Sequence, residues 1–201
     1  GYCQNCEIAR ADADSVEWEE FTPEALVALA EQTRNKGNIG IAFTYNEPLV
    51  GYEFVLDTAR LAKKRDLKTV LVTNGMILKE PWERLIPFID AANIDLKSFT
   101  KEGYIMLGGD FDTVKETIAA ASGNMHLELT TLIVPGLNDS EREMREEAAR
   151  IASLSPEIPL HLSRFFPRHR MRDCAPTPPE TIYQLTEIAR ESLRFVYTGN
   201  L

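Results

Sequence analysis

The sequence predicts an α/β protein, a partial, TIM-like (β/α) barrel of parallel strands. Short β-branched runs alternate with helical patterns along the 201 residues, and the connections between them are short, which is typical of βαβ units and a parallel sheet. Right-handed crossovers in series give either an open sheet or a barrel. No G-x-G-x-x-G follows the first strand, which weakens the dinucleotide-binding open sheet and favours the barrel.

The expected elements follow in order along the chain. We expect Thr22 to be the N-cap of the first helix and Pro23 to be the first residue of its first turn. Turn signals at 74–75 and 135–136 end two of the strands. The expected strands cover residues 37–45, 68–73, 92–96, 126–134, 160–166 and 193–197. The expected helices begin at 22–23, 48 and 138–140 and cover residues 81–86, 111–121 and 179–190. The helix capped within 138–140 carries Met144, Ala148 and Ile151. This length predicts a single domain over residues 1–201.

The composition narrows the classes of partner. Apolar residues make up 44% of the chain and charged residues 26%, as in ordinary globular domains. The net charge of −9 argues against nucleic-acid binding and against anionic membrane surfaces, and no apolar run is long enough to span a bilayer. Three cysteines cannot all pair, so a reducing, cytoplasmic location is expected.

Charged and amide side chains gather where the predicted strands end. Chemistry in parallel sheets lies at the carboxyl ends of the strands, so together they indicate a ligand site, although they identify no catalytic residue. Each also has a structural explanation, as a helix cap, a turn, a neutralising pair or a hydrogen-bonded core histidine. The residues are Asn46, Glu47, Asn74, Asp95, Lys97 and, in the fifth strand, His161.

Cys3 and Cys6 form a C-x-x-C at the start of the chain. Such a pair can be half of a zinc site, a redox dithiol or part of an iron–sulfur motif. The remaining cysteine, Cys174, stands alone and makes only a weak duo with His169. The spacing of these residues leaves the three alternatives open.

The opening G-Y-C-Q-N-C resembles the end of the cluster loop of the radical SAM superfamily. In that superfamily C-x3-C-x2-C follows the first barrel strand, and an aromatic residue precedes the third cysteine. Tyr2-Cys3 matches that step, so Cys3 would be the third ligand and Cys6 would not be one. A rival register makes Cys3 and Cys6 the last two ligands but places no aromatic before the final cysteine. The first strand and the other cysteines would lie upstream of Gly1.

Further segments extend the resemblance along the chain. T-Y-N-E-P, V-T-N-G and I-D-L-K, at residues 44–48, 72–75 and 94–97, are similar to segments of pyruvate formate-lyase activating enzymes. Residues 131–139, 161–167 and 195–200 resemble a narrower group, the radical SAM protein of the AmmeMemoRadiSam system. That group often continues into a cysteine-rich tail, so we expect truncation at the C-terminus as well as at the N-terminus.

The resemblance implies a [4Fe–4S] cluster with one iron open to S-adenosylmethionine (SAM). Reductive cleavage of SAM would yield a 5′-deoxyadenosyl radical that abstracts hydrogen from a substrate, which is a protein for activating enzymes. Cys3 would bind the metal, and Glu47 would accept a hydrogen bond from the amino group of SAM. The other implied cofactor-binding residues are Asn46, Asn74, Asp95, Lys97 and His161. An electron donor such as flavodoxin or ferredoxin is also implied. This fragment, with one of three cluster cysteines, is expected to be inactive.

Two other functions compete with this interpretation. The chain could be a conventional (β/α) barrel lyase or isomerase that uses Lys97 or Asp95 without a cluster, or a non-catalytic zinc module that uses the terminal cysteines. Residues 103–110 contain two adjacent glycines and are either a mobile cover or an ordinary connection between helices. Residues 164–172 carry four arginines and a histidine in an acidic chain, and form either a docking site for an anionic substrate or protein or a solvated loop.

Overall fold

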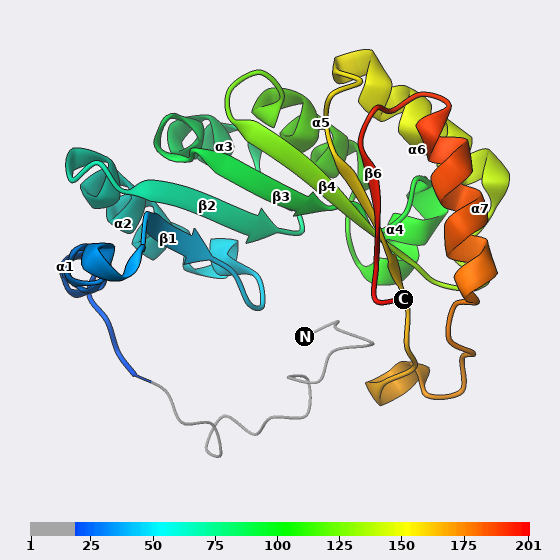
Figure 1. The fold of residues 1–201 in the computed structure, drawn as a ribbon, viewed down its shortest axis with the longest axis horizontal. Helices are drawn as coiled ribbons and strands as arrows, with labels where there is room; N and C mark the ends of the chain where they lie inside the picture. The colour runs from blue at the N-terminus through cyan, green and yellow to red at the C-terminus, as the bar shows by residue number, and fades with distance from the viewer. Residues whose placement is uncertain (1–18) are drawn as a thin grey trace. The chain divides into compact units, whose positions relative to one another are not determined.

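A sheet of six parallel strands alternates with helices in the computed structural model, which describes residues 19–201 (Figure 1). The strands lie in chain order, and this arrangement confirms the predicted α/β class. They are β1 (Gly40–Phe43), β2 (Lys68–Thr73), β3 (Ala91–Asp95), β4 (His126–Ile133), β5 (Leu160–Arg164) and β6 (Val196–Gly199). The α-helices are α1 (Pro23–Gln32), α2 (Tyr52–Lys64), α3 (Lys79–Leu85), α4 (Lys101–Leu107), α5 (Phe111–Ala121), α6 (Glu141–Leu154) and α7 (Pro179–Arg190).

The described chain divides into two compact units. The first unit contains residues 20–95 and 112–128, and the second unit contains residues 96–111 and 129–201. The expectation of a single domain stays a prediction. In the described part of the chain, no helix has both the length and the apolar character that crossing a bilayer requires.

The first unit is built on β1, β2 and β3. The Thr22 hydroxyl accepts a hydrogen bond from Ala25 N at 3.2 Å and caps α1, as the sequence predicts. β1 pairs with β2 in the register Gly40↔Lys68, and a Cβ at Gly40 would collide with the Lys68 carbonyl, so only glycine fits there. Leu71 of β2 is fully buried, which contributes about 1.5–3 kcal/mol relative to leaving it in water.

The second unit is built on β5 and its neighbours. β5 pairs in parallel with β4, in the register Leu129↔Leu160, and with β6, in the register Leu160↔Val196. Leu129 and Leu160 are fully buried, and Val196 is 2% exposed. The Ser140 hydroxyl accepts a hydrogen bond from Glu143 N at 3.2 Å and caps α6, which lies beside α7 (Figure 1). This cap confirms the predicted start of the helix.

Three of the differences from the prediction have a local reason. Most of residues 103–110 belongs to α4, because the Thr100 hydroxyl caps that helix and Gly108 ends it with a positive φ of 75°. β1 begins only at Gly40, whose N–H donates to the Asn38 side chain at 3.0 Å. The last strand begins three residues late, because Leu193 N still bonds back to Ala189 O at the end of α7.

Candidate functional site

Glu47 joins the ends of two strands in the first unit. It is the N-cap of the short 3₁₀-helix Pro48–Gly51 that follows β1, and its Oε1 accepts from Leu49 N at 3.1 Å. The same oxygen accepts from Thr73 Oγ1 at 2.7 Å, and Oε2 accepts from Asn74 N at 2.7 Å. The carboxylate is therefore held from both sides at the carboxyl edge of β1 and β2.

This bonding leaves Glu47 able to accept one more donor. An ionised carboxylate offers about four lone-pair positions, and three are used by protein donors. The side chain is half-buried, so it remains within reach of a ligand. A negative charge held in a fixed orientation is suited to binding an ammonium group through a charge-assisted hydrogen bond.

The other candidate residues of the first unit lie at the same strand ends. Asn74 follows β2 directly, and its Oδ1 accepts from Met76 N at 2.8 Å in a turn that Gly75 completes with a φ of 72°. Asp95 ends β3, and the register Thr73↔Ile94 places it one position beyond the partner of Thr73. The backbone therefore brings Glu47, Asn74 and Asp95 to one edge of the sheet. Asn46 is exposed beside Glu47.

Lys97, in the second unit, has its backbone held on both sides. Its N–H donates to Tyr104 Oη at 3.1 Å, and its carbonyl accepts from Asn138 Nδ2 at 3.1 Å. Asn138 is buried, and it also donates to Leu132 O at 2.9 Å and accepts from Val134 N at 2.7 Å. These contacts fix the path of the chain at the residue that the sequence places in the site.

Glu143 holds the two residues that follow Lys97. Its Oε1 accepts from Ser98 Oγ at 2.8 Å and from Phe99 N at 2.6 Å, and the carboxylate is buried. The S-x-x-E pattern that starts at Ser140 is typical of a capping box, in which the glutamate reaches back to the N-cap backbone. The pattern therefore marks Glu143 without indicating its contact with a segment more than 40 residues away. The sequence pattern does not identify Tyr104, Asn138 and Glu143 as the residues that hold this segment.

Glu147 is a second buried carboxyl group, one turn beyond Glu143 on α6. It is 1% exposed, and its Oε1 accepts from Thr131 Oγ1 at 2.6 Å. Burial, reinforced by the charge of Glu143, raises the pKa of Glu147 to about 8, although the hydrogen bond from Thr131 acts in the opposite direction. Glu147 is therefore mostly protonated at neutral pH, and Thr131 faces the helix rather than a ligand.

The remaining candidates are placed as follows. His161 is the second residue of β5, toward the amino end of the strand, and its ring stacks on Tyr197 at a centroid distance of 5.4 Å. Arg164 donates from Nε to Thr177 O at 2.8 Å. Cys174 is a half-buried free cysteine. Cys3 lies outside the described residues. Within residues 19–201, no three His, Cys, Asp or Glu side chains are grouped so as to hold a metal ion.

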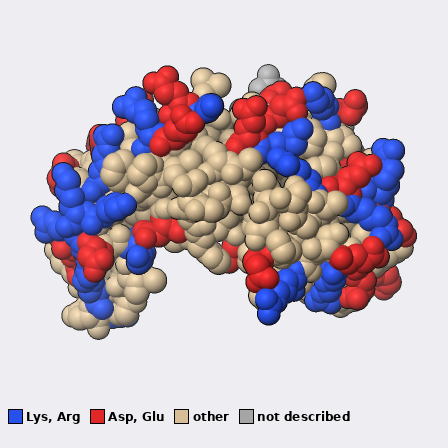
Figure 2. All heavy atoms as spheres, turned by 90° about the horizontal axis from the view of Figure 1, so that it is seen from above, with Lys and Arg blue, Asp and Glu red and all other residues tan. Residues whose placement is uncertain are grey.

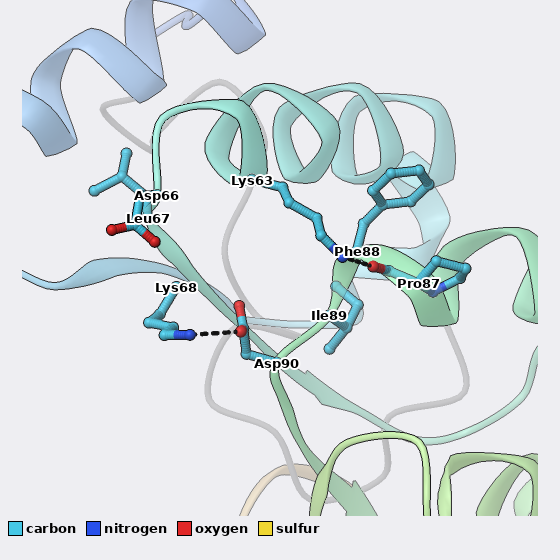
Figure 3. A pocket seen from close by; sticks show the side chains of 8 residues that line it. All are labelled: Lys63, Asp66, Leu67, Lys68, Pro87, Phe88, Ile89 and Asp90. Atoms are coloured by element: carbon cyan, nitrogen blue, oxygen red, sulfur yellow. Dashed lines mark hydrogen bonds and ion pairs between the residues drawn. The ribbon is translucent and has the colours of Figure 1, made fainter.

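A cavity of about 220 Å³ in the first unit lies at the opposite, amino ends of β2 and β3 (Figure 3). Lys68 and Asp90 form an ion pair of 3.0 Å across it, and Asp90 Oδ2 also accepts from Thr69 N at 2.9 Å. Lys63 Nζ donates to Pro87 O at 2.5 Å. These groups satisfy one another, and this is the edge of a parallel sheet where residues serve stability rather than chemistry. The cavity is structural.

The face drawn in Figure 2 carries Lys and Arg side chains interspersed with Asp and Glu side chains. The net charge of −9 is therefore not gathered into one acidic field on this face.

Comparison with known proteins identifies a family. The sequence profile of the Radical SAM superfamily matches residues 1–148. The protein MJ0808 of Methanocaldococcus jannaschii is 36% identical over 100% of this chain and 60% of its own length. The 4-hydroxyphenylacetate decarboxylase activating enzyme of Clostridioides difficile strain 630 is 26% identical over 63% of this chain and 42% of its own length. The chain thus spans about 60% or less of these relatives.

Solved structures share the fold. A domain of pyruvate-formate lyase-activating enzyme from Bacteroides vulgatus matches with a TM-score of 0.67 and 20% identity, over 80% of this chain and 99% of that domain. SuiB of Streptococcus suis bound to SAM matches with a TM-score of 0.72 and 12% identity, over 91% of this chain and 44% of SuiB. SuiB bound to its precursor peptide SuiA gives a TM-score of 0.68 and 11% identity, over 94% and 44%. These matches confirm the predicted partial-barrel type of α/β fold.

Proposed function

Because this chain belongs to the radical SAM superfamily, we propose that its protein cleaves SAM reductively and uses the product to abstract hydrogen from a substrate. When bound, a [4Fe–4S] cluster would supply the electron that breaks the sulfonium carbon–sulfur bond of SAM, giving methionine and a 5′-deoxyadenosyl radical. The protein's own contribution is to bind SAM, orient it and exclude water.

The geometry of Glu47 is the observation that carries the proposal. A SAM amino group is cationic, and Glu47 offers a carboxylate whose direction is set by Thr73 and by the backbone of Asn74. Because the acceptor is already oriented, binding costs little side-chain entropy, and the hydrogen bond is charge-assisted. The remaining position on the carboxylate suits one N–H of the ammonium.

The other candidate residues take the remaining polar groups of SAM. Asn74, Asp95 and Asn46, at the strand ends of the first unit, offer donors and acceptors for ribose hydroxyls. Lys97 and His161 belong to the second unit, and their part in binding SAM stays a prediction from the resemblance. Cys3 would be one of three cysteines on the cluster. The described residues fit SAM through Glu47, while the cluster ligand lies outside them.

The substrate class we propose is a polypeptide. Two observations support it: a relative is an activating enzyme, and SuiB, which shares the fold, has been solved with a precursor peptide. The proposed electron donor is a flavodoxin or ferredoxin, and the proposed location is the cytoplasm.

The test uses the full protein as encoded. Anaerobic reconstitution with iron and sulfide should give thiolate-to-iron absorbance, and dithionite with SAM should give 5′-deoxyadenosine. Cys3→Ala should remove both signals. A protein that binds no iron and forms no 5′-deoxyadenosine would instead be a conventional barrel enzyme or, with stoichiometric zinc, a zinc module.

Glu47→Gln tests the SAM site itself. We expect SAM to bind about 10- to 100-fold more weakly, because a hydrogen bond to a charged group is worth ~1.5–3 kcal/mol. Glu53→Gln, on the exposed side of α2, removes the same charge as a control. Thermal melting of both variants separates lost binding from lost folding. Unchanged SAM affinity in a folded Glu47→Gln protein would remove Glu47 from the site.

A further inference from the structure

The segment between β5 and α7 concentrates positive charge in an acidic chain. Residues 168–172, here called the basic loop, contain three arginines and a histidine and no acidic residue, while the chain as a whole carries a net charge of −9. The loop follows the carboxyl end of β5. This is the end of a parallel strand where substrates and partners are usually held.

One buried side chain, Thr177, joins the two chain segments that flank the basic loop, here called its neck. Thr177 is fully buried, and its hydroxyl donates to Ile133 O at 2.5 Å. Phe165 N donates to the Thr177 hydroxyl at 3.1 Å, and Thr177 N donates to Phe165 O at 3.1 Å. Both segments that flank the loop are therefore fixed to the sheet, so residues 168–172, the tip, extend from a defined position. A surface organised before binding loses less entropy when a partner arrives.

Arg164 belongs to the neck and not to the charged tip. Its Nε donates to Thr177 O at 2.8 Å, and its guanidinium lies 4.8 Å from the centre of the Phe166 ring. This corrects the sequence-based grouping of Arg164 with the arginines that follow it. The charge available to a partner comes from the basic loop itself.

The arginines of the tip are exposed, and their charge is incompletely compensated. Arg170 and Arg172 form no ion pair with any residue in the described part of the chain. By contrast, several exposed arginines elsewhere in the second unit are paired with glutamates, among them Arg145 with Glu191, Arg190 with Glu187, and Arg194 with Glu157. Exposed, unpaired guanidinium groups form bidentate hydrogen bonds with carboxylates at little desolvation cost.

We propose that the basic loop is a docking surface for an acidic segment of a partner protein. The positive charge of the loop favours an anionic partner. The small size of the basic loop favours a protein over a nucleic acid. A nucleic acid carries one charge per ~1.7 Å and needs an extended basic surface, which a chain of net charge −9 lacks. A few clustered carboxylates match the short loop. This inference goes beyond the proposed function, because docking requires neither SAM nor a cluster.

The test uses a fluorescein-labelled oligoglutamate peptide and the full chain, followed by fluorescence anisotropy at low ionic strength. We expect saturable binding that weakens about 10-fold or more when salt shortens the Debye length from ~30 Å to ~8 Å. The charge-reversing double variant Arg170→Glu/Arg172→Glu should weaken binding at least about 10-fold, because its glutamates repel the acidic peptide. The neutralising double variant Arg170→Gln/Arg172→Gln should weaken binding by less, because it removes the attraction without adding repulsion.

Arg142→Glu/Arg150→Glu is the matched control, since both arginines are exposed on α6 and the net charge changes equally. It should bind the peptide nearly as wild type does. Equal weakening by both reversals, equal binding of an oligoglutamine peptide, or tighter binding of a DNA oligonucleotide would each overturn the proposal. Far-UV circular dichroism confirms folding, and if the reversal variant does not fold, the neutralising pair decides the outcome against the same control.

Discussion

Substituting Glu147 with glutamine should flatten the pH dependence of the free energy of unfolding. Glu147 is a buried residue of α6, and burial together with the neighbouring charge of Glu143 raises its pKa to about 8 from 4.5. The folded protein therefore holds a proton that the unfolded chain releases at neutral pH. A glutamine side chain at this position would keep an acceptor for the Thr131 hydroxyl, which lies 2.6 Å from the carboxyl oxygen, and would need no proton.

The sign and size of the effect follow from these two pKa values. Because the folded value lies above the unfolded value, the folded state binds more protons between them, and stability is lost as pH rises from about 4.5 to about 8. At ~1.4 kcal/mol per pH unit, the loss is at most about 5 kcal/mol. Water penetration and relaxation around a buried charge reduce it to about 2–3 kcal/mol.

Urea unfolding at about pH 5, 7 and 9 measures this difference. Wild type and Glu147→Gln should have similar stability at the lowest pH, and the variant should be more stable by about 2–3 kcal/mol at the highest pH. Glu146→Gln, at the next and exposed position of α6, is the control and should run parallel to wild type. Parallel curves for wild type and Glu147→Gln would refute the reasoning, because Glu147 would then titrate alike in both states.

Three further substitutions test other contacts by urea unfolding. Asp90→Asn should lower the free energy of unfolding by about 1 kcal/mol at neutral pH, since it weakens the acceptor for Thr69 N. Burial raises the pKa of Asp90, but hydrogen bonds outweigh burial and hold the pKa below 3.8. The stability difference between wild type and variant should therefore fade only in acid. An Asp90→Asn protein with wild-type stability would contradict this. Asn138→Ala should cost about 2–4 kcal/mol of unfolding free energy, because three backbone groups, one in a buried and two in part-buried hydrogen bonds, lose a partner; a loss under ~1 kcal/mol would show that they are satisfied otherwise. Gly103→Ala should cost about 1–3 kcal/mol of unfolding free energy, because the new Cβ would collide with Ser98 unless α4 shifts; Gly51→Ala, where nothing lies near the added atom and φ is negative, is the control.

Features set by neighbouring residues were predictable from the sequence. The caps at Thr22 and Ser140 depend on a hydroxyl and an N–H three residues apart, so the pattern is readable without tertiary information. The alternation of strands and helices likewise indicates a parallel sheet, because only right-handed crossovers connect such elements compactly. The polar residues at 47, 74 and 95 were placed at strand ends for the same reason.

Features that depend on distant residues were not predictable. Glu143 fits a capping box, but its carboxylate bonds Ser98 and Phe99 instead, and no local pattern distinguishes the two partners. The glycines at 108 and 109 suggested a flexible cover, whereas Gly108 only ends α4. The pKa of Glu147 depends on complete burial, which a single sequence does not reveal.

Glu47 shows why a structural and a functional interpretation need not exclude each other. The sequence allowed Glu47 to be a helix cap or a ligand residue, and the structure shows the cap, through Leu49 N, together with two bonds from the end of β2. Such bonding fixes the direction of the carboxylate before a ligand arrives, and a fixed direction is what a specific ammonium site requires. It also means that any Glu47 variant perturbs both the turn and the site. Binding and stability must therefore be measured on the same variant, and only a loss of affinity without a matching loss of stability assigns Glu47 to the ligand.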